Sequence, residues 1–131
     1  MENLLRAAAI AWLRDDPELA TINAIEEESP LSASPPWLGI AASATTDWST
    51  KDRVGREVRI AFELETRGDE PAADAALIQR IGRRLQTLPR EGSGYSLVSA
   101  WFLRARSERR SNNLRGALLE YRFRLLEPKT E

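Results

Sequence analysis

Residues 57–66 read EVRIAFELET, and this stretch decides the fold. Large apolar side chains alternate with polar ones along it, which is the period of two expected of a strand with one buried face. The apolar residues are Val58, Ile60, Phe62 and Leu64. The charged residues on the other face are Glu57, Arg59, Glu63 and Glu65. We therefore expect one face to pack as core and the other to meet water or a partner.

The sequence before this strand predicts a second strand and a polar loop. Residues 37–42 (WLGIAA) form a short apolar run typical of a buried strand. Residues 43–55 are polar apart from Trp48 and Val54. A tryptophan in a polar loop either folds back onto its own domain or lies at the centre of a contact surface. Both interpretations of Trp48 stay open at this level.

Two helices are predicted, one at the N-terminus and one directly after the central strand. Residues 3–14 place apolar side chains at three- and four-residue spacing. The second helix begins near Pro71, because proline is favoured in a first turn, and it ends before Pro89. Its apolar stripe consists of Leu77, Ile81, Leu85 and Leu88. We expect this stripe to pack against the apolar face of residues 57–66.

The C-terminal part predicts a long hairpin made of residues 95–106 and 115–126. Pairing of the two strands about Asn112 places Trp101 opposite Phe123, which keeps large apolar side chains together on one face. This register requires three loop residues or a bulge, because a bare two-residue turn shifts it by one position.

Length and pattern together predict an α+β fold. At 131 residues the chain is long enough to bury a conventional core. We expect a single domain over residues 1–131, in which a mostly antiparallel sheet that includes the C-terminal hairpin packs with the two helices. The sequence has no apolar run of about 20 residues and no signal-peptide pattern, so we expect a soluble, cytoplasmic protein.

The chain contains neither cysteine nor histidine. The absence of cysteine excludes disulfides, thiolate metal sites and thiol nucleophiles. Histidine is the usual general base and the commonest metal ligand in proteins. We therefore expect no enzymatic activity, no cofactor and no metal site.

Charge is divided unevenly along the sequence. Residues 1–78 contain 15 acidic and 7 basic residues, a net charge of −8, whereas residues 79–131 contain 5 acidic and 12 basic residues, a net charge of +7. Such an arrangement either balances within one fold or gives identical subunits complementary faces for head-to-tail association.

One face of the predicted hairpin is rich in arginine. The arginines are Arg104, Arg106, Arg122 and Arg124. Glu120, placed opposite Arg104, is the only acidic residue on that face. The face fits three interpretations: a solvated surface, a contact for an acidic subunit, or a surface for nucleic acid. Phe102 is the only aromatic residue expected there, so stacking on bases is not favoured.

Nearly the whole chain resembles a family of small tail-completion proteins of long-tailed bacteriophages and gene transfer agents. Residues 11–20 (AWLRDDPELA) are similar to the N-terminal part of that family. The most specific elements are Asp47-Trp48-Ser49-Thr50, the Gly55-Arg56-Glu57 entry to the central strand, and Arg122-Phe123-Arg124 at the end of the hairpin. Residues 25–36 depart from the family pattern, which has a shorter, glycine-containing turn there.

The resemblance implies a tail terminator. Such a protein forms a ring, commonly a hexamer, on the last ring of the tail tube, ends tube polymerisation and offers a docking surface to the head side. The implied partners are other copies of the chain, the tail tube protein and a head-side connector or stopper protein. DNA is expected only in passing through the lumen, and no membrane is expected. The implied location is the tail or neck of a virion or phage-like particle assembled in the bacterial cytoplasm.

Two sets of residues are expected at contacts on this interpretation. Those expected at a subunit or tube contact are Trp48, Lys51, Arg53, Arg56, Glu57, Arg59, Glu63 and Glu65. Those expected at an interface or in the lumen are Arg104, Arg106, Arg122 and Arg124. Two alternative functions stay open: another neck protein, such as a head-completion or stopper protein, and a nucleic-acid-binding module that uses the arginine hairpin.

Overall fold

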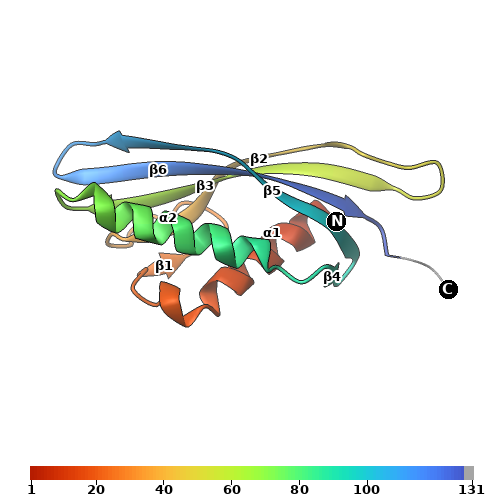
Figure 1. The fold of residues 1–131 in the computed structure, drawn as a ribbon, viewed down its shortest axis with the longest axis horizontal. Helices are drawn as coiled ribbons and strands as arrows, with labels where there is room; N and C mark the ends of the chain where they lie inside the picture. Colours follow the sequence, from red (N-terminus) through yellow and green to blue (C-terminus); the bar gives the residue numbers. More distant parts are fainter. Residues whose placement is uncertain (129–131) are drawn as a thin grey trace.

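The computed structural model describes residues 1–128 as two helices packed on one curled sheet (Figure 1). In chain order the elements are α1 (Glu2–Arg14), the short 3₁₀ helix η1 (Pro17–Leu19), β1 (Ala24–Ile25), β2 (Trp37–Asp47), β3 (Gly55–Arg67), α2 (Pro71–Gln86), β4 (Glu91–Gly92), β5 (Tyr95–Arg109) and β6 (Leu114–Leu126). The α+β class, the two helices and the long C-terminal hairpin are those that the sequence predicts.

The six strands lie in the order β1-β2-β3-β6-β5-β4. β1 pairs parallel with β2, and the other pairings are antiparallel. β3 contains the stretch EVRIAFELET and lies between β2 and β6. Both helices cover the same side of the sheet, and the β2–β3 and β5–β6 loops lie at opposite ends of the longest axis (Figure 1).

The apolar face of β3 is the centre of the core. Its large apolar side chains are almost completely buried, namely Val58, Ile60, Phe62 and Leu64. They belong to one apolar cluster with Ile81 and Leu85 of α2 and with Leu88 just beyond that helix, and Leu77 packs at the edge of the cluster. The predicted packing of the strand against the helix stripe is therefore confirmed.

Polar contacts join α1 and the turn after it to α2. The Trp12 indole donates a hydrogen bond to the backbone oxygen of Arg84 at 2.9 Å, and Arg84 Nε donates to the backbone oxygen of Trp12 at 2.7 Å. Arg80 contacts the buried carboxylate of Asp16, which also accepts a hydrogen bond from the backbone N–H of Glu18 in η1. The two helices therefore form one connected layer beneath the sheet.

β2 is longer than the sequence predicts. The pattern indicates a strand that ends at residue 42 and a loop over residues 43–55, but the strand continues to Asp47. The extension pairs with β3, for example Thr45 opposite Val58. Side chains from residue 41 onward are exposed, so backbone pairing rather than burial of apolar groups holds this part of the strand.

The β5–β6 hairpin turns through residues 111–113, the three-residue loop that the sequence predicts. Asn112 and Asn113 have φ angles of 58° and 60°, in the left-handed region that asparagine tolerates better than most residues. Close to the loop, Arg104 lies opposite Glu120, also as predicted.

A bulge at Leu103 then shifts the pairing by one residue. The prediction that Trp101 faces Phe123 is therefore wrong. Trp101 lies opposite Arg122, on the side of the sheet away from the helices, while Phe102 takes a place on the helix side. The physical reason is the period of two in a strand, because one inserted residue moves every side chain beyond it to the opposite face.

Candidate subunit-contact surface

The side of the sheet that points away from both helices carries most of the residues predicted for contacts, and we call it the helix-free face. The predicted residues on it are Glu57, Arg59, Glu63, Glu65, Arg104, Arg106, Arg122 and Arg124. Glu57 of β3 lies directly opposite Arg124 of β6. Strand alternation explains why the sequence places these charges correctly on one face.

Glu57 is the centre of an ion cluster on the helix-free face. Arg124 Nε donates a hydrogen bond to its carboxylate at 3.1 Å. Arg122 and Arg59 approach the same carboxylate to 3.9 and 3.7 Å. The Arg124 guanidinium also lies 5.3 Å from the centre of the Trp48 ring, within the range of a cation–π contact. Much of the charge that the sequence assigns to a neighbouring subunit is thus balanced inside the chain.

Arg110 is the centre of a second ion cluster, which sequence reasoning missed. Its guanidinium contacts Glu63 at 2.8 Å, Glu65 at 3.0 Å and Glu108 at 3.1 Å. The side chain folds back over Gly116, where an added Cβ would lie only 2.3 Å from the guanidinium carbon. The sequence signal that points to this arrangement is the glycine itself, because a glycine within a strand leaves room for the close approach of another group.

Glu63 and Glu65 have further partners on the β2 side. Ser29 Oγ donates a hydrogen bond to Glu63 at 3.2 Å, and the Trp37 indole donates to Glu65 at 2.8 Å. Each carboxylate therefore has more than one polar partner within its own chain. Their contact with a neighbouring subunit stays a prediction.

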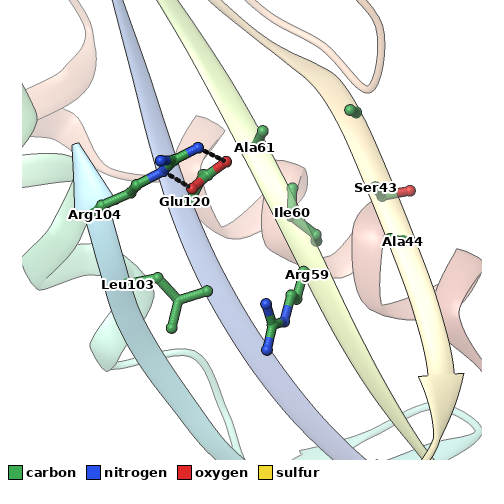
Figure 2. Close-up of a pocket in the computed structure, with 9 residues that line it drawn as sticks. Ser43, Ala44, Arg59, Ile60, Ala61, Leu103, Arg104 and Glu120 are labelled. Carbon is green, nitrogen blue, oxygen red and sulfur yellow. Dashed lines mark hydrogen bonds and ion pairs between the residues drawn. The ribbon is translucent and has the colours of Figure 1, made fainter. Parts of the chain in front are cut away.

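A depression of about 530 Å³ lies in the middle of the helix-free face (Figure 2). Small residues of β2, Ala42 and Ala44, line one side of it, and Leu103 of β5 lines another. The ion pair of Arg104 with Glu120 borders the depression, and the hydrogen bond from Arg104 lowers the pKa of that carboxyl group. Apolar walls with a charged rim suit a side chain from another protein.

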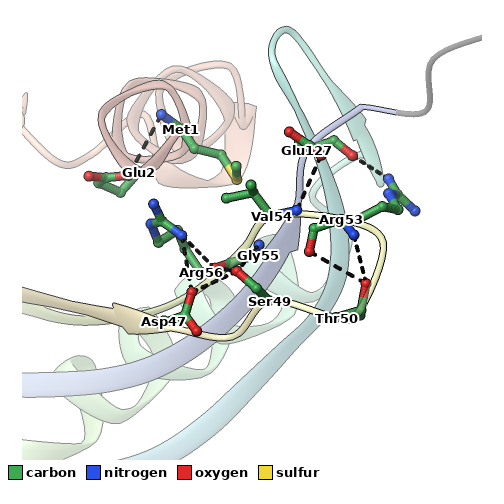
Figure 3. A network of polar contacts seen from close by, with 10 residues as sticks. All are labelled: Met1, Glu2, Asp47, Ser49, Thr50, Arg53, Val54, Gly55, Arg56 and Glu127. Atoms are coloured by element: carbon green, nitrogen blue, oxygen red, sulfur yellow. Dashed lines mark hydrogen bonds and ion pairs between the residues drawn. The ribbon is translucent and has the colours of Figure 1, made fainter.

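Hydrogen bonds hold the β2–β3 loop, residues 48–54 (Figure 3). Ser49 Oγ donates to the Asp47 carboxylate at 2.6 Å and accepts from the Gly55 backbone N–H at 3.0 Å. An added Cβ at Gly55 would lie 2.3 Å from the Trp48 carbonyl oxygen. The turn is therefore compatible only with glycine at this position.

The charged residues predicted for contacts in this loop and at the start of β3 have different surroundings. Arg53 donates a hydrogen bond to the backbone oxygen of Glu127, just past β6 (Figure 3). Arg56 forms an ion pair with Asp47 at 3.4 Å, whereas Lys51 is exposed. The loop is thus anchored to the end of β6 and presents Lys51 to solvent.

Trp48 and Trp101 differ in exposure. Trp48 is half-buried and lies outside the apolar core. Trp101 is 60% exposed, although the predicted register placed it in the core. The structure therefore adds Trp101 to the helix-free face and removes Phe102 from it.

Residues 1–128 contain no group of three or more acidic side chains arranged to hold a metal ion. Over the same residues, no helix is both long enough and apolar enough to cross a membrane.

The fold is that of a small α+β protein with paired charges along one face of its sheet. The chain belongs to the tail completion protein gp17 family, whose model matches residues 7–126. A chain of a solved structure described as the virion of a native gene transfer agent (GTA) particle has the same fold, with 23% sequence identity over 97% of each chain and a TM-score of 0.82. No curated protein sequence matches. Family membership makes the chain a structural protein of the phage-tail type and confirms the resemblance seen in the sequence.

Proposed function

We propose that this chain assembles as a closed ring, most simply a hexamer, that caps the tail tube of a phage or phage-like particle. The ring ends tube polymerisation and presents a docking surface to a head-side connector or stopper protein. The observation that carries the proposal is the family match over residues 7–126. Its partners on this proposal are other copies of the chain and the tail tube protein, with DNA passing through the lumen.

The proposed role requires contacts and no bond-making chemistry. The chain lacks histidine and cysteine, and most of the charged side chains on the helix-free face pair with one another. We therefore propose that the protein is not an enzyme.

The β2–β3 loop is the proposed contact with the tube or with a neighbouring subunit. It projects at one end of the molecule, is held in one shape by its hydrogen bonds, and exposes Lys51 beside the half-buried Trp48. A preformed loop loses little conformational freedom on binding, which favours such a role. The arginines of β5 and β6 are proposed to be partly interfacial and partly lumenal.

Deletion of this chain from the particle's gene set tests the proposed function. Without a terminator, tail tubes should grow to uncontrolled lengths and fail to join heads, which electron microscopy of lysates measures directly. Re-expression of the chain in the same cells should restore a uniform tube length. Tubes of normal length in the deletion strain would contradict the proposal.

A second function, binding of nucleic acid, is favoured by one observation. Trp101 is exposed beside Arg122 on the helix-free face, and an aromatic ring next to arginines is the usual platform for a stacked base. The ion pairs with Glu57 oppose this function because they occupy the same arginines. Steeply salt-dependent binding of DNA by the isolated monomer would favour it over the ring.

A further inference from the structure

The sheet has two long strands that each lack a neighbouring strand along most of one side. Within residues 1–128, β1 pairs with β2 only at Trp37 and Leu38, and β4 pairs with β5 only at Tyr95 and Ser96. The Leu38 carbonyl also accepts a hydrogen bond from the Glu26 N–H, and the Leu97 N–H donates to the Arg90 carbonyl. Beyond these contacts the outer side of β2 from Ile40 and the outer side of β5 from Val98 are open edges. The unpaired backbone groups of an open edge can accept another strand.

The two edges carry side chains of different size. Three of the six large apolar side chains that are exposed in the described residues belong to β5: Val98 at 48%, Trp101 at 60% and Phe102 at 47%. The β2 edge exposes small residues instead, among them Ala42 and Ala44. An exposed tryptophan is a common centre of protein contacts. Trp101 lies on the helix-free face, as Ala42 and Ala44 do, so this large side chain of one edge can cover the small side chains of the other.

The two edges also differ in charge. Residues 26–28 are three exposed glutamates that continue from β1 along the β2 edge, where the Glu26 backbone N–H donates to the Leu38 carbonyl at 3.0 Å. The β5 edge carries the exposed Arg106 and Arg109, which have no ion pair within the described residues. The β2 edge therefore carries acidic and small side chains, and the β5 edge carries basic and large ones.

We infer that the β5 edge of one copy binds the β2 edge of the next copy, so that one sheet continues from subunit to subunit. The inference rests on the proposed ring. Every copy carries both the β2 edge and the β5 edge, which are complementary in side-chain size and in charge. This identifies the partner as a second copy of this chain. Because the contact uses two different surfaces, each added copy leaves one edge of each kind open until the ring closes.

Strand direction agrees with this contact. Three antiparallel steps separate β2 from β5 in the sheet, so the two strands run in opposite directions. A second copy placed beside the first in the same orientation brings its β2 antiparallel to the β5 of the first. The joined edges then form an ordinary antiparallel ladder.

Site-directed crosslinking tests the contact. The chain has no native cysteine, so only the introduced cysteines can react. One version of the chain carries Ala44→Cys on β2, and a second version, tagged to differ in mass, carries Arg106→Cys on β5. Both positions are exposed on the helix-free face, so neither change disturbs the core. Treated with a flexible bis-maleimide, the mixture should give a covalent heterodimer. A chain with both substitutions should give a ladder whose largest member reports the number of subunits in the ring.

The control replaces the β2 cysteine by Gln79→Cys, at an exposed position on α2, and should give no heterodimer with Arg106→Cys. If light scattering shows that the protein is oligomeric but no Ala44–Arg106 heterodimer forms, the edge contact is wrong. The proposed ring is not contradicted by that result. A chain that is monomeric in solution, and that gives no crosslink to itself in purified particles, overturns both the edge contact and the ring.

A second variant tests the energetic role of the exposed tryptophan. Trp101→Ser should raise the concentration at which half of the protein is assembled by about tenfold or more, because a tryptophan central to a contact is a typical hot spot. Circular dichroism should show an unchanged fold, since the side chain is mostly exposed. The matched control is Leu4→Ala, which removes a similarly exposed apolar side chain from α1 and should leave assembly unchanged. Equal assembly of both variants and the original chain would overturn the inference.

Discussion

Arg80 holds Asp16 with two hydrogen bonds, from Nε at 2.6 Å and from a terminal nitrogen at 2.8 Å. The Asp16 side chain is completely buried, although Arg80 is only partly so. The pair fixes α2 to the turn that follows α1. The position of the helix layer under the sheet therefore depends on a charge pair as well as on apolar packing.

Arg80→Ala should lower the stability of the fold clearly, because it leaves the Asp16 carboxylate buried without its cation. Urea unfolding followed by circular dichroism measures the change as a lower midpoint with an unchanged slope. The control is Arg83→Ala, which removes an exposed arginine from the same helix and should change stability by no more than about 0.5 kcal/mol. Equal midpoints for the two variants would show that the Asp16 contact contributes nothing.

The free energy of unfolding should depend on pH through the Asp16 carboxyl group. The hydrogen bonds from Arg80 lower the pKa of this group below its ordinary value of 3.8. The unfolded chain therefore binds a proton there before the folded chain does, and the stabilisation is present above about pH 4 and is lost as the pH falls through the folded pKa. The difference in unfolding free energy between the original chain and Asp16→Asn should be largest at neutral pH and should shrink below pH 4. Asp15→Asn, at the exposed neighbour, should not show this dependence.

Gly55→Ala should distort the β2–β3 loop. The added methyl group would meet the Trp48 carbonyl oxygen at 2.3 Å, and overpacking of this kind costs about 1–3 kcal/mol. Urea unfolding measures the loss, and proteolysis within residues 48–54 should become faster. Val54→Ala, an exposed change in the same loop, is the control and should behave as the original chain does. Resistance to proteolysis in Gly55→Ala equal to that of the original chain would contradict the requirement for glycine at this position.

Glu57→Gln should increase the affinity for DNA, because it removes the carboxylate that Arg124, Arg122 and Arg59 share. Each arginine released to a phosphate should steepen the dependence of log affinity on log salt by about 0.9. Fluorescence anisotropy with a labelled duplex at several salt concentrations measures both quantities. Glu26→Gln makes the same change of net charge away from the arginines and should have little effect. A similar increase in both variants would mean that net charge alone controls binding.

β3 and α2 could be predicted from the sequence because their signals are local. The alternation along residues 57–66 and the apolar stripe bounded by Pro71 and Pro89 each identify an element without knowledge of its neighbours. The second half of β2 has no such signal. Its exposed side chains show no apolar period, and the strand exists because β3 supplies a backbone partner.

The candidate surface shows the same division between local and long-range information. Alternation along each strand was enough to place the charges on the correct face. Their partners were not predictable, because the contact of Glu57 with Arg124 depends on β3 lying beside β6, far apart in the sequence. The exposure of Trp101 depends on a single inserted residue at Leu103, which leaves no mark in the apolar pattern.

The two loops at opposite ends of the longest axis give the proposed assembly a direction (Figure 1). If subunits join through their sheet edges, the β2–β3 loops gather on one rim of the ring and the β5–β6 loops on the other. One rim then presents Trp48 and Lys51, and the other presents Asn112 and Asn113. The two rims of such a ring differ, so a ring that is turned over does not fit the same neighbour. On this proposal one rim binds the tube, and the next component binds only to the other rim.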